Sequence, residues 1–199
     1  MEQQYTTLTK DINNVDNKDA IVYAYIKSRM NYKTSIADNV TEKEISEKLG
    51  ISLSTVKRSV AKLKNNKNLI DKVISNNVIA DGSYKTYNKY YMAKCNENFF
   101  YIYNSFFNDD MNIAEASERI KIKNFLLKLK AVCKKETNKY ISENPYLDTL
   151  NKTELSKKLG IDTKTLNNYL EMAVNAGHIK SRMNYKTSIA DNVTEKEIS

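Results

Sequence analysis

At residues 41–70 the chain reads TEKEISEKLGISLSTVKRSVAKLKNNKNLI, in which two short helical patterns are separated by one glycine. Thr41 and Glu44 have the spacing of a capping box, in which a hydroxyl and a carboxylate each satisfy an unpaired backbone N–H, so a helix is expected to begin at residue 42. Gly50 can take the left-handed conformation that ends a helix sharply. A second helix follows within a few residues, so the segment predicts a helix-turn-helix.

The second helix of this segment has one apolar stripe and one polar face. Val56, Val60 and Leu63 recur at i, i+4 and i+7, which predicts a single buried stripe. At about 100° per residue the opposite face is small, polar and basic. That face carries Ser54, Arg58, Ala61, Lys62 and Asn65, with Thr55 at its edge, and either Ser52 or Ser54 can cap the helix. Hydroxyls and a guanidinium suit phosphate oxygens and base edges, so the face predicts DNA reading in a major groove. The alternative is the solvated face of an ordinary helical hairpin.

The composition favours a polyanionic partner. The 199 residues carry a net charge of +8, with a pI near 9.2. Such a balance favours nucleic acid but is shared with ribosomal and membrane-surface proteins. No apolar run approaches the roughly 20 residues that span a bilayer, and the polar start MEQQYTTLTK lacks the apolar region of a signal peptide. We therefore expect a cytoplasmic protein without a membrane partner.

The chain has few residues suited to catalysis or metal binding. His178 is its only histidine, and Cys95 and Cys133 form no CxxC pair, so no metal site and no cofactor are expected. The tyrosines leave a DNA recombinase or nicking enzyme as a remote alternative. That chemistry needs histidines or an arginine cluster to stabilise a pentavalent phosphate, which the sequence does not supply. We expect no enzymatic activity.

A strand-like region follows the helix-turn-helix. The runs VISNNVIA and SYKTYNKYYMA flank Asp81 and Gly82, a strong hairpin signal. With this order of elements, residues 1–95 resemble the winged-helix domains of bacterial plasmid and phage replication initiators and of mobile-element transcription regulators. The resemblance rests on ISEKLGISLSTVKRSVAKLKNNKNLI and implies that the second helix and the hairpin approach DNA. The DNA-contacting residues expected in this domain are Thr41, Ser52, Ser54, Thr55, Lys57, Arg58, Lys62, Asn65, Ser83, Tyr84 and Lys85.

An aromatic run, FFYIYNSFF, occupies residues 99–107. So much apolar area must be buried, either inside the chain or against a partner. Aromatic anchors are enriched at the centres of interfaces, so a homodimer is a second possibility. Its contact residues would be Phe99, Phe100, Phe106 and Phe107.

A second helix-turn-helix is expected at residues 151–180, where KTELSKKLGIDTKTLNNYLEMAVNAGHI aligns with the first unit at a constant spacing of 110. Its outward face has lost two cations and gained Glu171, so its DNA contact should be weaker, and contact with a protein or with a second copy is equally open. The residues expected to make the weaker contact are Lys164, Thr165, Asn167 and Asn168.

The C-terminal segment repeats an earlier one. IKSRMNYKTSIADNVTEKEIS at residues 26–46 recurs without change at 179–199, which points to recent recombination or to an artefact of sequence assembly, the latter being favoured. The copy contains no second-helix sequence, so it is expected to add at most a strand.

Together these patterns predict a mainly α protein with a small β-hairpin wing, built from tandem winged-helix or helix-turn-helix units. The domains expected are a winged-helix DNA-binding domain at 1–95, a helical domain with the second unit at 96–180, and a tail at 181–199 that duplicates 28–46. The expected function is sequence-specific binding of double-stranded DNA as a transcription regulator of a mobile element or phage. A plasmid or phage replication initiator, or a partition protein that binds origin repeats, is the alternative.

Overall fold

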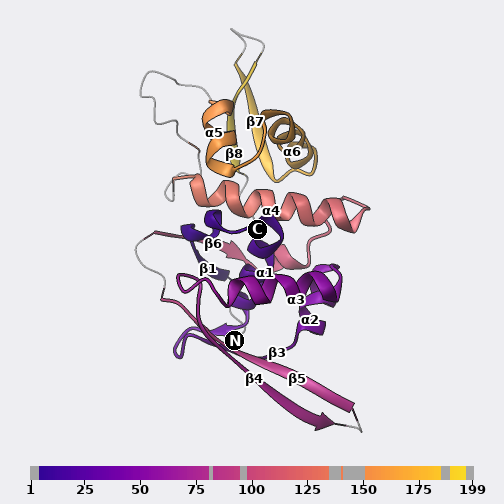
Figure 1. The fold of residues 1–199 in the computed structure, drawn as a ribbon. Coiled ribbons are helices and arrows are strands. Elements are labelled where there is room, and N and C mark those ends of the chain that lie inside the picture. The colour runs from indigo at the N-terminus through magenta and orange to yellow at the C-terminus, as the bar shows by residue number, and fades with distance from the viewer. Residues whose placement is uncertain are drawn as a thin grey trace.

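The structure, a computed structural model, describes residues 5–80, 83–94, 98–134, 140, 151–184 and 189–195 (Figure 1). The α-helices of this part are α1 Asn17–Ser28, α2 Glu42–Leu49, α3 Leu53–Leu63, α4 Ala116–Val132, α5 Lys152–Leu159 and α6 Thr163–Asn175. Its strands are β1 Tyr5–Thr9, β2 Met30–Asn31, β3 Ile36–Val40, β4 Ile70–Ala80, β5 Ser83–Met92, β6 Phe99–Tyr103, β7 Ile179–Asn184 and β8 Ile189–Glu195. Two short 3₁₀ helices, η1 Lys10–Asn14 and η2 Asn104–Phe107, follow β1 and β6.

The fold is mixed α/β, so the expectation of a mainly α protein with one small hairpin wing is wrong. The described strands form three antiparallel sheets, β1-β6, β2-β3-β5-β4 and β7-β8. The apolar spacing near the N-terminus suggests a short helix or an irregular arm, but the segment begins as strand β1 and continues into η1. The aromatic run likewise begins as strand β6 and continues into η2. The β4–β5 hairpin is also extended by β3 and β2 into a four-stranded sheet, and its far end projects from the body (Figure 1).

The aromatic run alternates in and out, as a half-buried strand does. Phe100 and Ile102 are buried, whereas Tyr101 and Tyr103 are about half exposed. Strand β6 pairs along its whole length with β1, from which Leu8 enters the same core. This pairing joins the N-terminal strand to a segment that follows the hairpin.

The aromatic residues proposed as dimer anchors lie largely inside the chain. Phe100, Phe106 and Phe107 are at most 6 % exposed, and Phe99 is half-buried. The Phe107 ring meets Tyr25 of α1 edge to face at 5.5 Å between centroids. These rings therefore take the first of the two expected destinations, burial inside the chain: 3₁₀ helix η2 turns Phe106 towards α4 and Phe107 towards α1. A homodimer stays a prediction, and Phe100, Phe106 and Phe107 are not exposed to form its contact surface.

Helix α1 lies at the centre of the part of the fold that precedes α5 (Figure 1). Its residues 20–26 are all buried, and it packs on β1, α3 and α4. Helix α4 is buried along most of its length and separates α1 from α5, α6 and the β7–β8 hairpin (Figure 1). Asn124 of α4 accepts a hydrogen bond from the backbone N–H of Ile21 at 3.0 Å and so ties the two helices together.

Two lysines of α4 are buried. Lys128 is 7 % exposed and Lys123 is only 3 % exposed. The Lys123 ammonium donates to the carbonyl of Phe107 at 3.0 Å and lies 5.6 Å from the centre of the Phe106 ring. Burial lowers the pKa of Lys123 to about 8.

This pKa predicts a pH dependence of folding. Between about pH 8 and 10 the unfolded chain holds the Lys123 proton more tightly than the folded chain does, so its contribution to the free energy of unfolding should rise with pH. One proton corresponds to at most about 1.4 kcal/mol per pH unit. Above that window the opposite effect is expected from Tyr25 and Tyr90, because burial raises the pKa of both phenols.

Urea unfolding of the wild type and of Lys123→Met at pH 8, 9 and 10 measures this effect. The wild type should gain stability relative to the variant as the pH rises. Parallel pH profiles for the two proteins would contradict it.

The C-terminal copy forms a hairpin of its own. Strand β7 pairs with β8, and the expectation of one added strand understates this. Within the described residues, no helix has the length and apolar character needed to cross a lipid bilayer.

Candidate nucleic-acid interface

The first helix-turn-helix has the local structure that its sequence predicts. Helix α2 ends at Gly50, which is left-handed with φ of 64°. Helix α3 then begins after Ser52, whose hydroxyl accepts the backbone N–H of Thr55 at 3.2 Å. Of the two serines considered as the cap, Ser52 is therefore the one used. Val56, Val60 and Leu63 are buried against the core, as expected for the apolar stripe.

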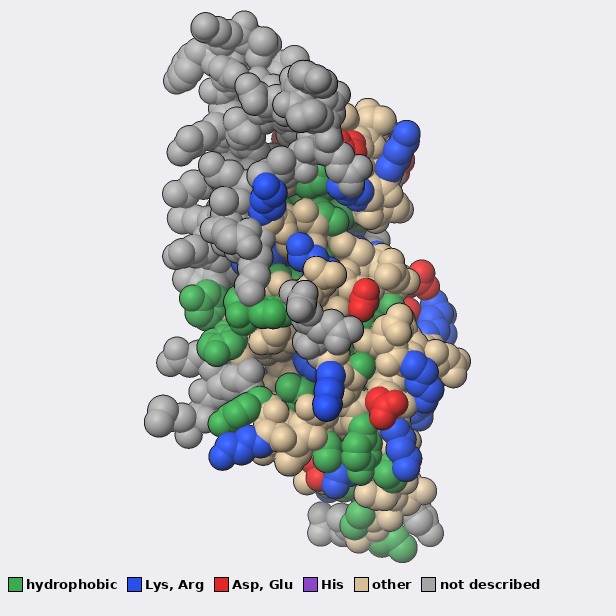
Figure 2. Space-filling view, turned by 90° about the vertical axis from the view of Figure 1, so that its left-hand side faces the viewer, with side chains coloured by type: hydrophobic (Ala, Val, Ile, Leu, Met, Phe, Trp, Pro, Cys, Tyr) green, Lys and Arg blue, Asp and Glu red, His purple; other side chains and the backbone are tan. Residues whose placement is uncertain are grey.

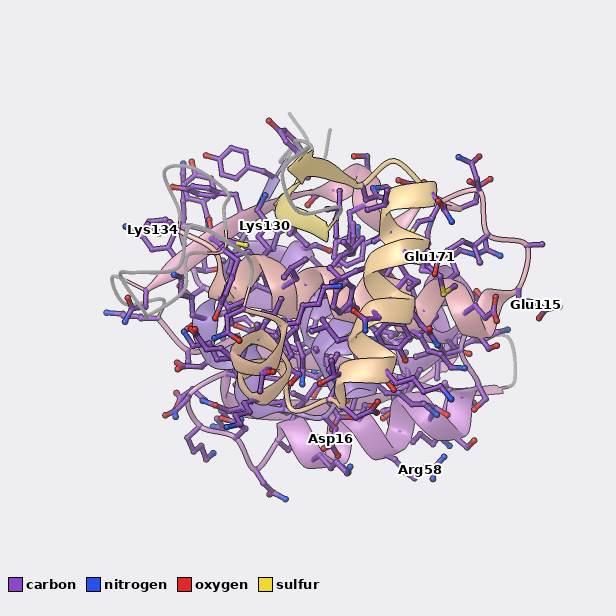
Figure 3. All side chains as sticks on the ribbon, turned by 90° about the horizontal axis from the view of Figure 1, so that it is seen from above. Asp16, Arg58, Glu115, Lys130, Lys134 and Glu171 are labelled. Atoms are coloured by element: carbon purple, nitrogen blue, oxygen red, sulfur yellow. The ribbon has the colours of Figure 1, made fainter. Side chains whose placement is uncertain are left out.

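The outward face of α3 is accessible. Ser54, Lys57, Arg58 and Lys62 are exposed, as is Asn65 just beyond the helix, and Thr55 is half-buried at the edge. Viewed from above, Arg58 projects from the edge of the molecule along which α3 runs (Figure 3). Its Nε donates to the Ser54 carbonyl at 3.4 Å. A guanidinium with its terminal nitrogens pointing outward can make the bidentate contact that recognises guanine.

Hydroxyl groups cluster at the start of α3. The Ser52 hydroxyl lies 3.0 Å from that of Ser54 and 2.8 Å from that of Thr55. Each hydroxyl can both donate and accept, so the cluster retains capacity for a phosphate oxygen or a base edge. The N-terminal end of a recognition helix is the part that contacts bases in helix-turn-helix proteins.

Lys62 is engaged by carboxylates that the sequence analysis did not associate with this face. Its ammonium forms an ion pair with Asp16 and lies 3.7 Å from Asp19, both at the start of α1. The hydrogen bond with Asp16 raises the pKa of Lys62 and lowers that of Asp16. Asp16 and Arg58 lie along the same edge (Figure 3), so a negative charge is placed beside the basic face.

We predict that Asp16→Asn strengthens DNA binding and makes it more salt-dependent. The change removes a carboxylate from the proposed DNA-facing edge and leaves the Lys62 ammonium with the longer contact to Asp19, at 3.7 Å, so that it can turn to a phosphate. The slope of log K against log salt concentration should steepen by about one unit, the effect of roughly one additional phosphate contact. Binding titrations over a range of salt concentrations measure it.

Asp110→Asn is the matched control, since it removes the same charge from an exposed position between η2 and α4, outside the proposed DNA-contacting elements. An equal change in slope for both variants would mean that only net charge matters and that the Lys62 pair has no specific role.

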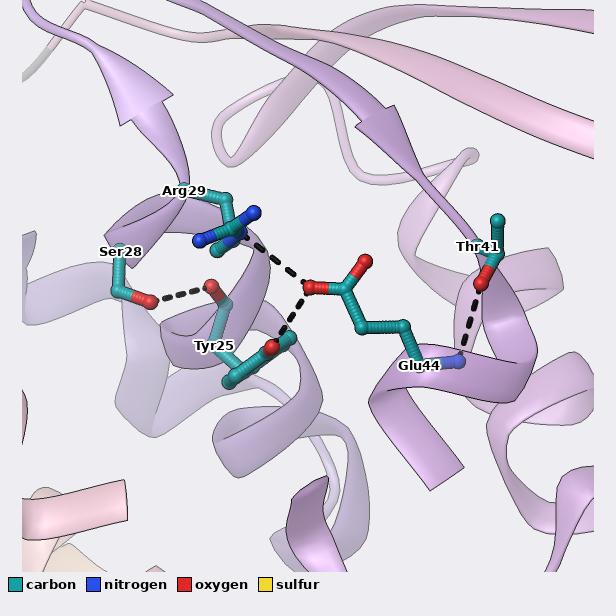
Figure 4. A network of polar contacts seen from close by, with 5 residues as sticks. All are labelled: Tyr25, Ser28, Arg29, Thr41 and Glu44. Carbon is teal, nitrogen blue, oxygen red and sulfur yellow. Dashed lines mark hydrogen bonds and ion pairs between the residues drawn. The ribbon is translucent and has the colours of Figure 1, made fainter. Parts of the chain in front are cut away.

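The capping box at the start of α2 is only half formed (Figure 4). The Thr41 hydroxyl accepts the backbone N–H of Glu44 at 3.0 Å, as expected. The Glu44 carboxylate does not return to Thr41. It accepts the Tyr25 hydroxyl at 2.8 Å and pairs with Arg29 at 3.3 Å (Figure 4). Glu44 therefore fastens α2 to the end of α1, and a DNA contact by Thr41 stays a prediction.

The β4–β5 hairpin is the other expected contact element. Lys85 is exposed, whereas the side chains of Ser83 and Tyr84 lie outside the described part of the chain, as do Asp81 and Gly82. Val78 and Ile79 near the tip are 46 % and 67 % exposed, which the sequence analysis did not anticipate. Figure 2 shows hydrophobic side chains gathered at this lower end, while lysines and arginines are spread over the visible face among acidic residues.

The second helix-turn-helix differs from the first at its cap. Gly160 is left-handed with φ of 65°, and α6 begins after Asp162, which stands where the first unit has Ser52. Asp162 accepts the Thr165 backbone N–H at 2.8 Å and the Thr165 hydroxyl at 2.6 Å. The side-chain hydrogen bond from Thr165 lowers the pKa of Asp162. The second unit therefore carries an anion at the position where the first offers a hydroxyl, and this charge should repel phosphate.

The other second-unit residues have mixed surroundings. Lys164, Asn167 and Asn168 are exposed, and Thr165 is half-buried. His178, just after α6, lies 3.5 Å from the Asp109 carboxylate. Among the described residues there is no group of His, Cys, Asp and Glu side chains suited to a metal ion.

Comparisons with protein-family models, with curated proteins and with solved structures found no match to this chain.

Proposed function

We propose that the chain binds double-stranded DNA sequence-specifically through the α2–α3 unit, with α3 in the major groove. Its role would be that of a transcription regulator of a mobile element or phage. The exposed face of α3 supports this proposal most directly, because Ser54, Lys57 and Arg58 are accessible on a helix whose opposite side is locked into the core. An α-helix fits the major groove, where each base pair presents a distinct pattern of donors and acceptors.

Two further features support the proposal. The net charge of +8 gives the attraction to phosphate that non-specific binding requires. The projecting β4–β5 hairpin provides a second element that can follow the DNA backbone or a minor groove. The second unit contributes less in this proposal, because Asp162 and Glu171 place carboxylates on its start and outward face.

Selection of duplex fragments from the host genome tests the proposal and separates the possible roles. We expect enrichment of a short sequence that binds at least about a thousandfold more tightly than random duplex at the same salt concentration. Fragments clustered at promoters would support regulation of transcription, whereas iterated copies in an origin would assign the chain to replication initiation or partition. Equal affinity for selected and random duplex would defeat sequence-specific binding.

A further inference from the structure

A cavity of about 510 Å³ lies between the α2–α3 turn, the first half of α4 and α6. This volume lies within the range of small-molecule sites. Ile51, Ile120 and Tyr169 supply apolar surface, and Thr55 of α3 forms part of the wall. The cavity therefore touches the proposed recognition helix and one helix of the second unit.

The charge of this cavity is one-sided. Lys18 and Lys121 line it and are exposed, and no acidic residue is among its described lining residues. Neither lysine has an ion-pair partner in the described part of the chain. A neighbouring cavity of about 330 Å³, lined by the end of α2 and by α4, has mixed charge, because Glu47 and Asp109 line it together with its cations.

We propose that the 510 Å³ cavity binds a small anionic ligand with an apolar body, of the class of aromatic carboxylates and sulfonates. Lys18 and Lys121 neutralise the anion, while Ile51, Ile120 and Tyr169 cover the apolar body. Burial of that body removes apolar surface from water, and two ammonium groups distinguish the anion from a neutral molecule of the same shape.

The ligand should also change DNA binding, a consequence that rests on the proposed function. Gly50 and Ser52 of the α2–α3 turn form part of the cavity wall together with Thr55. Ser52 holds the first turn of α3 through its bonds to Thr55, at 3.2 Å to the backbone N–H and 2.8 Å to the hydroxyl. An anion in the cavity can accept the Ser52 and Thr55 O–H groups while the Ser52 oxygen keeps the Thr55 N–H. It then occupies the hydroxyls that would otherwise meet a phosphate or a base edge at the start of α3.

The test uses 1-anilinonaphthalene-8-sulfonate, whose fluorescence rises in an apolar site, with the full chain. The wild type should bind one equivalent saturably while its near-ultraviolet circular dichroism stays native. Lys18→Gln and Lys121→Gln should each raise the Kd about fivefold, the effect expected for losing one partly exposed charge pair. Ser117→Phe, which places a ring in the cavity from α4, should abolish saturable binding.

Two controls make the comparison specific. Lys134→Gln removes the same charge from an exposed site at the other end of α4 (Figure 3) and should leave the Kd unchanged. The neutral analogue N-phenyl-1-naphthylamine should bind the wild type more weakly and show no dependence on Lys18 or Lys121.

Equal Kd values for the wild type and both lysine variants, or no saturable binding, would overturn the anion site. Loss of DNA affinity in Lys121→Gln without any binding of the sulfonate would instead show that the cavity is part of the DNA-binding surface. That result would also overturn the proposal. Binding of the sulfonate that leaves DNA affinity unchanged would reject the coupling alone. Failure of the chain to bind DNA would reject the proposed function and leave the anion site standing.

Discussion

Replacing Arg58 by alanine is expected to weaken binding to the selected duplex by about 1 to 3 kcal/mol and to relax the preference at one base pair. Arg58 is exposed on the outward face of α3, one turn after Ser54, whose carbonyl accepts its Nε–H at 3.4 Å. That bond orients the guanidinium along the helix and leaves its terminal nitrogens to meet a guanine. Titrations against the selected site and its single-base variants measure both effects.

Two variants separate base reading from charge. Arg58→Lys keeps the cation but loses the planar fork, so it should recover less than half of the lost binding free energy if the contact is bidentate. Lys43→Ala removes a cation from α2 that already pairs with Glu47 at 3.7 Å, and it should change affinity little. An equal loss on selected and random duplex in Arg58→Ala would show that Arg58 contacts only phosphate.

Replacing Phe106 by alanine is expected to lower the free energy of unfolding by about 3 to 5 kcal/mol, the cost of a cavity left by a fully buried aromatic ring. Phe106 is 1 % exposed. Its ring packs against that of Phe107 at 5.9 Å between centroids, and the Lys123 ammonium lies 5.6 Å from the Phe106 ring centroid. The variant therefore loses both the packing of the ring and the support of a buried cation. Denaturant unfolding followed by circular dichroism measures the loss.

Tyr103→Ala is the matched control in the same aromatic run, because its side chain is 46 % exposed and should cost much less. Phe107→Asp should unfold the chain, since it places a carboxylate in the core. A folded Phe107→Asp monomer obtained from a wild-type dimer would contradict the intramolecular burial of these rings.

The helix-turn-helix could be predicted because everything that specifies it is local. The Ser52 cap, the left-handed Gly50 and the stripe of Val56, Val60 and Leu63 lie within a few turns of one another. Each acts on its own backbone or on the next turn, so the sequence pattern contains the cause. The accessible face of α3 follows directly from this periodicity.

The charges around that face could not be predicted, because they depend on contacts between distant residues. Lys62 meets Asp16 across 46 positions. The Glu44 carboxylate, instead of completing the capping box, accepts the hydroxyl of Tyr25 in α1 and pairs with Arg29 just after that helix. The strand character of β1 and β6 was also missed. Whether such a short segment forms a strand depends on its partner strand. The partners here are far apart in the sequence, since residues 5–9 pair with residues 99–103.

The segment that occurs at both 26–46 and 179–199 shows which structure comes from the local sequence and which from its surroundings. In both copies the same strand register forms, with Met30 opposite Ala37 and Met183 opposite Ala190, so the sequence by itself determines this pairing. The three residues IKS that precede it are helical at 26–28 and extended at 179–181. At 26–28 they prolong α1, whose hydrogen-bonded turns already exist, and prolonging a helix costs far less than starting one. At 179–181 they follow Gly177, which is left-handed with φ of 77° after the end of α6, so no helix is present to prolong and they pair as a strand.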